Sequence, residues 1–320
     1  MAVQQRRPKH KTTRKLGMQA IAGMVLVSIG VLLCTMPLMF MVGNLNEQSS
    51  VTAAHEDKSL KLAKEQRQQE IKEAQEYNER LASEGQNVLG EVTDPFSSGD
   101  DGKTLSEQDE DYQSQLDTPA DGIMATIKYP TLGINLPVRH GTSSKVLDMG
   151  AGHMYGTSLP VGGSSTHAVI SAHTGLADQV MFDRLSLRQA KIGDFFYITV
   201  LDETLAYKVK SITVVEPNQF DELKIVEGED LVTLLTCTPY GVNNMRILVT
   251  RERTTMPHPA PDLKDAAKDN TGKYIVAVIV VAWALALALM VVYVKRKPKK
   301  QTKHANSTRP KDDSPELPVD

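Results

Sequence analysis

Two long runs without a charged side chain constrain what this sequence can fold into more than any other feature. The first covers residues 16–42 and the second covers residues 274–294. A helix needs about 20 apolar residues to cross the hydrocarbon core of a bilayer, so both runs are long enough. A helix in the core of a soluble protein rarely stays uncharged on every side over this length. The sequence therefore predicts two transmembrane helices, one near each end of the chain.

The basic residues next to the two runs predict how the chain crosses the membrane. A basic segment without acids precedes the first run, and another basic segment follows the second. These residues are Arg6, Arg7, Lys9, Lys11, Arg14, Lys15, Lys295, Arg296, Lys297, Lys299 and Lys300. Basic flanks of transmembrane helices stay on the cytoplasmic side. Both termini are therefore expected in the cytoplasm, with residues 45–272 on the extracellular face of the cell membrane.

A cleaved signal peptide is the alternative interpretation of the first run. Such peptides have an apolar centre of about 7–15 residues and end at a small-residue site of the Ala-x-Ala type. The run over residues 16–42 is much longer, and residues 39–44 read Met-Phe-Met-Val-Gly-Asn. We therefore expect a retained membrane anchor rather than a signal that is removed.

The middle of the chain, residues 124–253, has the pattern of a β-protein. Short segments rich in Val, Ile, Thr and Tyr alternate with turn residues, which is typical of an all-β barrel or sandwich. The size of the region suits one closed barrel. The segments predicted as strands are Ala125–Tyr129, Leu132–Val138, His167–Ser171, Phe195–Leu201, Thr204–Val215, Leu231–Thr236 and Arg246–Arg251.

The other extracellular segments differ from this pattern. Residues 56–90 are rich in Glu, Lys, Gln and Ala and predict one or two polar amphipathic helices, whereas the acidic residues 97–119 predict a loop or mobile linker. Ser143–Gly150 and Met181–Ile192 are expected to form short helices. The predicted division of the chain is a cytoplasmic basic segment (1–15), a transmembrane helix (16–42), a helical extracellular segment (45–123), the barrel (124–253), a linker (254–272), a transmembrane helix (274–294) and a cytoplasmic tail (295–320).

Charge and cysteine content narrow the possible functions. The formal net charge is -3, so nothing in the composition suggests nucleic acid as a partner. The chain has two cysteines, Cys34 in the first apolar run and Cys237 in the extracellular region, and these two locations exclude a disulfide between them. A lone extracellular cysteine is either a small buried apolar residue, which is the more common case, or a reactive thiol.

The position of Cys237 favours the reactive thiol. It ends the strand-like segment 231–237 and precedes a turn, which holds a side chain rigidly with its tip toward solvent. A thiol needs a base, usually histidine, to become a thiolate. His173 also ends a strand and enters a glycine turn, and Arg246 begins the strand after Cys237. A cation there would favour a thiolate and stabilise charge on a carbonyl oxygen. The alternatives are a structural histidine and a surface arginine.

The sequence around these residues resembles the sortase family. Residues 233–237 read Thr-Leu-Leu-Thr-Cys and, with Arg246 downstream, resemble the cysteine–arginine signature of sortases, while Ser-Ala-His-Thr-Gly at 171–175 resembles their histidine motif. Residues 152–160, Gly-His-Met-Tyr-Gly-Thr-Ser-Leu-Pro, resemble class C, the pilin-polymerising sortases of Gram-positive bacteria. The resemblance covers about residues 90–253 and implies a closed sortase-type β-barrel of about eight strands with short peripheral helices.

Two further features resemble class C. One is the second transmembrane helix, and the other is the sequence Asp94-Pro95-Phe96 before the barrel. Class C sortases carry a lid with an Asp-Pro-aromatic motif that occupies the active site. The resemblance implies that Asp94 pairs with Arg246 and that Phe96 covers Cys237. An ordinary Asp-Pro turn is the alternative for these three residues.

The resemblance implies a cysteine transpeptidase that needs neither a cofactor nor a metal. Cys237 would attack the Thr–Gly bond of an LPXTG-like sorting signal, His173 would protonate the leaving amine, and Arg246 would hold the substrate or the oxyanion. A lysine of the next pilin subunit would then resolve the thioester. The implied partners are pilin subunits or surface proteins with such signals. Thr236 and residues 216–229 are expected to shape the substrate groove.

Three other functions are alternatives to a class C sortase. A papain-like protease is excluded, because its cysteine begins a helix and precedes the histidine, whereas here His173 comes first and both residues end strands. A housekeeping sortase that anchors proteins to the cell wall is closer, but it lacks the lid and usually the second membrane helix. A non-catalytic, membrane-tethered binding module would leave Cys237, His173 and Arg246 without a shared purpose.

Overall fold

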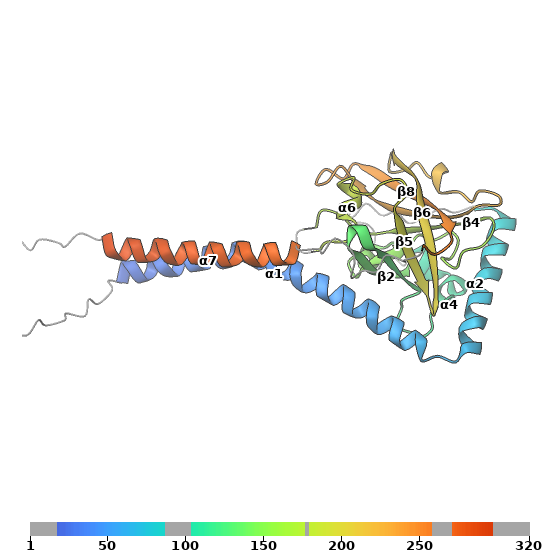
Figure 1. The fold of residues 1–320 in the computed structure, drawn as a ribbon, viewed down its shortest axis with the longest axis horizontal. Coiled ribbons are helices and arrows are strands. Elements are labelled where there is room, and N and C mark those ends of the chain that lie inside the picture. The colour runs from blue at the N-terminus through green and yellow to red at the C-terminus, as the bar shows by residue number, and fades with distance from the viewer. Residues whose placement is uncertain (1–17, 87–103, 177–178, 258–270, 297–320) are drawn as a thin grey trace, which may run out of the picture. The chain divides into compact units, whose positions relative to one another are not determined.

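A closed barrel of eight strands forms the core of the unit that covers residues 33–279 (Figure 1). The structure is a computed structural model that describes residues 18–86, 104–176, 179–257 and 271–296. Around the barrel the strands follow the order β1-β2-β3-β4-β7-β8-β6-β5, which confirms the predicted fold class. The strands are β1 (Ala125–Tyr129), β2 (Ile134–His140), β3 (Ala151–His153), β4 (Thr166–Ser171), β5 (Phe195–Val200), β6 (Glu203–Val215), β7 (Asp230–Thr238) and β8 (Met245–Thr254).

Helices precede, interrupt and follow the strands. They are α1 (Met18–Leu60), α2 (Lys64–Glu84), α3 (Leu105–Gln108), α4 (Glu110–Ser114), α5 (Ser144–Leu147), α6 (Asp183–Ser186) and α7 (Thr271–Arg296), with single 3₁₀ turns at Pro130–Leu132 and Asp221–Leu223. Segments Val25–Leu60 and Tyr274–Val292 are long and apolar enough to cross a membrane. Residues 33–279 form one compact unit that contains the barrel, and the remaining parts of α1 and α7 belong to a second unit.

Alternation along the strands sorts side chains between the barrel interior and a second cluster on its outer face. Val232 and Leu234 of β7 belong to the main core, as does Val249 of β8, whereas Leu235 and Leu248 belong to the second cluster. Successive side chains of a strand point to opposite faces. The second cluster therefore marks the face that carries the odd-numbered residues of β7. Its members are Met154, Val169, Val215, Leu223, Leu235 and Leu248.

After its apolar part, α1 buries a polar face against the barrel unit. Gln48, Thr52, His55 and Ser59 recur at helical spacing and are all buried, whereas Leu60 is 63% exposed. The sequence predicted separate polar helices over residues 56–90, but α1 continues without a break to Leu60. A search for apolar periodicity cannot find this contact, because the residues that make it are polar.

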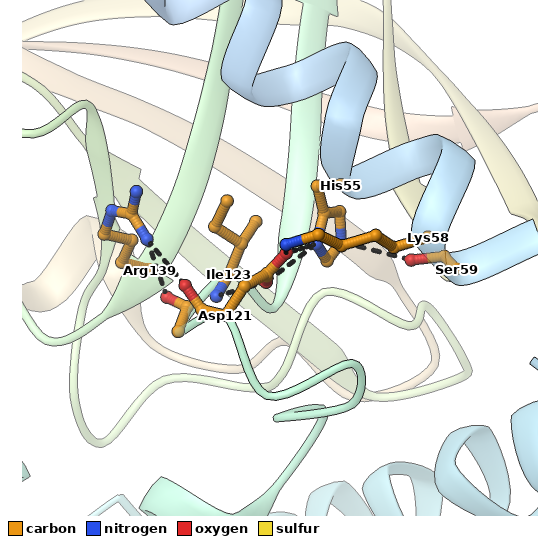
Figure 2. Close-up of polar contacts among 7 residues, drawn as sticks. His55, Lys58, Ser59, Asp121, Ile123 and Arg139 are labelled. Carbon is orange, nitrogen blue, oxygen red and sulfur yellow. Dashed lines mark hydrogen bonds and ion pairs between the residues drawn. The ribbon is translucent and has the colours of Figure 1, made fainter.

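Asp121, just before β1, contacts this polar face of α1 (Figure 2). Its carboxylate lies 3.0 Å from Nδ1 of His55 and accepts a hydrogen bond from Nζ of Lys58 at 3.3 Å. Arg139 donates to the main-chain oxygen of Asp121 at 3.3 Å. Partial burial raises the pKa of Asp121, but the charges and hydrogen bonds of His55 and Lys58 outweigh it and lower the pKa below its usual value. The ionised carboxylate thus ties α1 to the start of the barrel.

Residues 104–119 correct the prediction of a loop or linker over residues 97–119, whose first part, 97–103, lies outside the described residues. Helices α3 and α4 form there, with the side chains of Thr104 and Asp109 as their N-caps. Tyr112 of α4 is fully buried, and its hydroxyl lies 2.9 Å from Nδ1 of His153 on β3. The acidic composition suggested a solvated loop, but acids are also favourable in the first turn of a helix, and the buried Tyr112 and Leu116 anchor this segment.

Helix α2 lies along the outside of the barrel (Figure 1). Its Asn78 is 2% exposed and makes two hydrogen bonds with the backbone of Leu159: the amide oxygen accepts from N–H at 2.7 Å, and the amide nitrogen donates to C=O at 3.0 Å. Ile71 and Ala74 of the same helix belong to the main core. The helix therefore fixes the segment that leads into β4.

The predicted strands are present, with shifted ends. Strand β1 has the predicted bounds, whereas β2 begins two residues later than expected, and β7 and β8 extend further. Strand β3 was not predicted, because three residues are too few to show a period. The helices expected at Ser143–Gly150 and Met181–Ile192 are present but shorter, as α5 and α6.

Buried His153 should make the stability of the fold depend on pH. It is fully buried, with Nδ1 on the hydroxyl of Tyr112 and Nε2 on the carbonyl of Ser158 at 2.8 Å, and this burial lowers its pKa to about 4. An unfolded histidine titrates near pH 6.5. Between these values the unfolded chain binds a proton that the folded chain does not, so the stability falls as the pH falls. We expect this histidine to contribute a loss of about 2 kcal/mol between pH 7 and pH 5.

The measurement is urea unfolding of the full chain, followed by circular dichroism, at pH 7 and pH 5. His140 and His167 also have pKa values lowered by burial, so the wild type alone does not isolate His153. The His153→Gln variant removes one titrating ring. It should be less stable at pH 7 but lose about 2 kcal/mol less than the wild type on going to pH 5. Equal losses in both proteins would contradict the prediction.

Candidate active site

Cys237 and Arg246 lie side by side at the ends of two paired strands. Strands β7 and β8 are antiparallel, and their register places Cys237 directly opposite Arg246. Side chains directly opposite in such a pair have Cβ atoms about 4.5–5.5 Å apart. By alternation both residues share the outer face with Leu235 and Leu248. The thiol and the guanidinium are thus neighbours on the outside of the barrel, and both are buried, with 8% and 4% of each residue exposed.

His173 reaches the same place from the other side of β7. Strand β4 runs parallel to β7, with Ser171 opposite Leu235. The pairing continues past the strand end, because the N–H of Ala172 donates to the carbonyl of Leu235 at 3.3 Å. Two residues beyond Ser171, the same register brings His173 alongside Cys237. The structure therefore gathers all three predicted catalytic residues at the ends of β4, β7 and β8.

Thr236 connects the two strands that carry the thiol and the imidazole. Its hydroxyl donates to the carbonyl of Ala172 at 2.7 Å, and the residue is only 1% exposed. It points to the opposite face of β7 from Cys237. This contact holds the residue before His173 next to the residue before Cys237. The predicted contribution of Thr236 to a substrate groove remains a prediction.

The other described histidines of the barrel unit have structural partners. Both ring nitrogens of His153 are bound, and His167 contacts the carbonyl of Lys224 and the hydroxyl of Thr233. His55 contacts Asp121 and Ser59, and His140 contacts the carbonyl of Gln115. His258 lies outside the described residues. These contacts leave His173 as the described histidine best suited to proton transfer.

The imidazole of His173 is buried beside one carboxylate. The residue is 6% exposed, and its Nε2 lies 3.7 Å from Oδ1 of Asp148. Burial lowers the pKa of His173, and the negative charge of Asp148 partly offsets that effect. A buried imidazole with a lowered pKa is mainly neutral near pH 7 and suited to accept a proton.

Arg246 keeps a donor that nothing in the described part of the chain uses. Its Nη1 donates to the carbonyls of Asn243 and Met245 at 3.1 and 3.0 Å. Its Nε is buried without a hydrogen-bond partner among the described residues, as are the hydroxyls of Thr174 and Thr238. Buried polar atoms are normally satisfied, so the Nε of Arg246, on the residue opposite Cys237, is a donor suited to a polar group of a ligand.

Asp183 binds the backbone of the loop that follows His173, although no sequence motif identified it as part of the site. This carboxylate is 5% exposed and accepts hydrogen bonds from the N–H groups of Gly175 at 3.0 Å and Met181 at 2.8 Å. It also hydrogen-bonds to Tyr240 in the turn after Cys237; burial of the ring and this carboxylate raise the pKa of Tyr240. Asp183 thus connects the histidine loop with the turn after the cysteine. An Asp at the start of a helix was the available signal.

The predicted lid cannot be placed in this site. Asp94, Pro95 and Phe96 lie outside the described residues, so their pairing with Arg246 and their cover over Cys237 stay predictions. The loop over residues 216–229, expected to shape a groove, is described and carries the turn Asp221–Leu223. The placed residues already form a chemical unit: a thiol, a neighbouring base and a fixed cation are what nucleophilic acyl transfer requires.

Comparison with known proteins agrees with this chemistry. Residues 127–254 match the family model described as sortase domain. A curated relative, sortase A of Streptococcus agalactiae, is 30% identical over 134 residues, which are 41% of this chain and 54% of that protein. The chain therefore spans about half the length of this curated relative.

Solved structures match over nearly their whole length. Sortase C-1 of Actinomyces oris is 45% identical, with a TM-score of 0.52, and the match covers 60% of this chain and 99% of that one. A structure described as the pilus-related sortase C of Group B Streptococcus is 39% identical, with a TM-score of 0.53 and coverage of 62% and 95%. At 45% and 39% identity, these matches support a shared family as well as a shared fold.

Proposed function

The chain belongs to the sortase family of cysteine transpeptidases, and on this premise we propose that it is a membrane-anchored class C sortase that polymerises pilin subunits. The observation that carries the proposal is the register that puts Cys237 opposite Arg246, with His173 reached along β4. The class rests on the similarity to sortase C structures and on the second apolar helix.

The first half of the proposed reaction forms a thioester. The thiolate of Cys237 attacks the carbonyl carbon of Thr in an LPXTG-like signal, and the Thr–Gly bond breaks. His173, protonated when the thiolate forms, gives its proton to the leaving glycine amine. Arg246 holds the carbonyl oxygen as it becomes negative, using the donor that no described residue engages.

The second half transfers the acyl group. The amine of a pilin lysine attacks the thioester carbonyl and loses its proton to the neutral His173. The C–S bond breaks and an isopeptide bond forms, which regenerates the thiolate and the protonated imidazole. One peptide bond is exchanged for another, so the reaction needs no external reductant, oxidant or energy source.

The proposed location is the cell membrane, with the barrel on the extracellular face and both termini in the cytoplasm. The two apolar helices support anchoring, and the basic flanks of residues 1–15 and 295–320 support the orientation. Sorting-signal substrates that are themselves in the membrane would meet the enzyme at a high effective concentration. In this proposal Asp94 and Phe96 form the lid that closes the site between reactions.

The test uses the cell that encodes this chain. Deletion of the gene should abolish the detergent-resistant ladder of covalently joined surface proteins, and monomers should accumulate. The wild-type full chain should restore the ladder, and the Cys237→Ala variant should not. An intact ladder, together with surface proteins released into the medium, would contradict pilin polymerisation. It would indicate that the enzyme anchors proteins to the cell wall. An unchanged surface in the deletion strain would refute the transpeptidase assignment.

A further inference from the structure

One acidic side chain faces the imidazole of the site, and no motif pointed to it. Asp148 follows α5, and its Oδ1 lies 3.7 Å from Nε2 of His173. The carboxylate is 63% exposed, whereas the His173 side chain is 6% exposed. The acid therefore lies at the solvent edge of a buried base.

The backbone holds Asp148 in this position from two sides. Its N–H donates to the carbonyls of Ser144 and Val146 at the end of α5. Its own carbonyl accepts a hydrogen bond at 3.1 Å from Nε2 of Gln179, in the loop that follows His173. This hydrogen bond connects the end of α5 with the loop that follows His173.

Among the described residues, the other charged groups near this site have contacts of their own or are exposed. Asp183 on α6 accepts the N–H groups of Gly175 and Met181. Arg246 on β8 directs Nη1 to backbone carbonyls. On α5 itself, Lys145 is exposed, and Cys237 of β7 is the group with which the base must exchange a proton. Asp148 is therefore the carboxylate that the structure places at the imidazole.

A carboxylate beside the imidazole can raise the small fraction of thiol–imidazole pairs that are in the reactive, charged form. With reference pKa values of about 6.5 for histidine and 8.5 for cysteine, only about 1% of such pairs are in the reactive thiolate–imidazolium form. Burial lowers this fraction further, because it disfavours the charged imidazole. A negative charge beside Nε2 favours the charged imidazole and therefore the ion pair.

We propose that Asp148 is a positioning residue for the reaction: it holds Nε2 of His173 and stabilises the protonated imidazole, so that Nδ1 exchanges a proton with Cys237. This inference deepens the proposed transpeptidase function and rests on it. The direction agrees with the pKa of His173, which burial lowers and Asp148 raises. The carboxylate acts through the imidazole and touches no reacting atom.

The direct test is independent of catalysis. The full-length chain in detergent micelles, with the Cys237→Ala background and histidines labelled at Cε1, is titrated by NMR, and His173 is identified by its loss in a His173→Gln variant. Asp148→Asn should lower the pKa of His173. Asp148→Glu should keep the pKa near the parent value. The neutral imidazole should carry its proton on Nε2 in the ¹⁵N spectrum. An unchanged titration in Asp148→Asn, or a proton on Nδ1, would overturn the proposal.

A kinetic test separates this inference from the proposed function. With Cys237 restored and an LPXTG-type peptide as the probe, Asp148→Asn should lower kcat about fivefold, the factor given by unit charges about 4 Å apart in water. KM should stay unchanged and the acid limb of the kcat/KM profile should move to lower pH. A KM effect alone would contradict a positioning role. A peptide that no variant turns over, with the NMR shift present, would refute the proposed function and with it a role of Asp148 in the reaction, while the effect of Asp148 on the pKa of His173 would stand.

A matched control removes the same charge elsewhere. Glu203 is exposed at the start of β6, whereas the residue of β6 that pairs with Arg246 is Val215, twelve positions further along the strand. That spacing corresponds to about 40 Å of extended strand. Glu203→Gln should therefore change neither the His173 titration nor the peptide kinetics. A shift as large as that of Asp148→Asn would show a net-charge effect and overturn the proposal.

Discussion

Replacing Cys237 by alanine should abolish formation of an acyl-enzyme with an LPXTG-type peptide, with a fall in rate of at least ~10⁴-fold. The reason is chemical: a thioester needs a sulfur atom, and the substitution removes the sulfur of the residue opposite Arg246. The fold should be retained, because one small, 8% exposed side chain at a strand end is shortened. The measurement is the mass of the intact protein after acid quenching. The wild type should gain the mass of the acyl group, and Cys237→Ala should not.

The chain contains its own control for this result. Cys34 is the other cysteine, and it lies in the first apolar run on α1. The Cys34→Ala variant should acquire the acyl group at the rate of the wild type. An adduct that persists in Cys237→Ala, or one that disappears in Cys34→Ala, would place the nucleophile elsewhere and refute the catalytic assignment.

Replacing Arg246 by glutamine should lower kcat/KM for acyl-enzyme formation by about 10²–10³-fold, the loss typical of an oxyanion donor. The guanidinium lies opposite Cys237 in the strand register, and its buried Nε has no partner among the described residues. Glutamine removes the positive charge and the fork of donors, so the developing oxyanion loses its stabilisation. Arg246→Lys keeps the charge without the fork and should recover only part of the rate.

Two controls separate this effect from a loss of folding. Circular dichroism should show that Arg246→Gln unfolds within a few degrees of the wild type. Arg80→Gln removes an exposed arginine of α2 that pairs with Asp111, and because exposed ion pairs contribute about 0–1 kcal/mol, it should leave the rate unchanged. Activity of Arg246→Gln within threefold of the wild type would rule out an electrostatic role for the guanidinium.

The sequence identified the three central residues of the site but not the residues that position them. Cys237, His173 and Arg246 stand in local motifs at strand ends, and such motifs are visible without a structure. Asp148 and Asp183 follow or begin helices of only four residues. Their partners lie in loops whose course depends on the rest of the barrel. Nothing in their own neighbourhood distinguishes them from surface acids.

The helical part of the extracellular region was the least predictable. Residues 104–116 read as an acidic loop, yet Tyr112 is fully buried against His153. The face of α1 that meets the barrel is polar, with His55 on Asp121 (Figure 2). Apolar periodicity is the main signal for a buried helix face, so contacts made by ion pairs and hydrogen bonds escape it.

By itself, the sequence determined the two membrane-length helices, the strand-rich centre and the family motifs, because each depends on residues close together in the chain. The tertiary structure alone decided that these motifs meet. The antiparallel register of β7 and β8 sets Arg246 against Cys237, and the parallel register of β4 and β7 brings His173 from 64 positions earlier in the sequence. Register depends on which strands pair when the barrel closes, and that pairing is a long-range choice that no local pattern specifies.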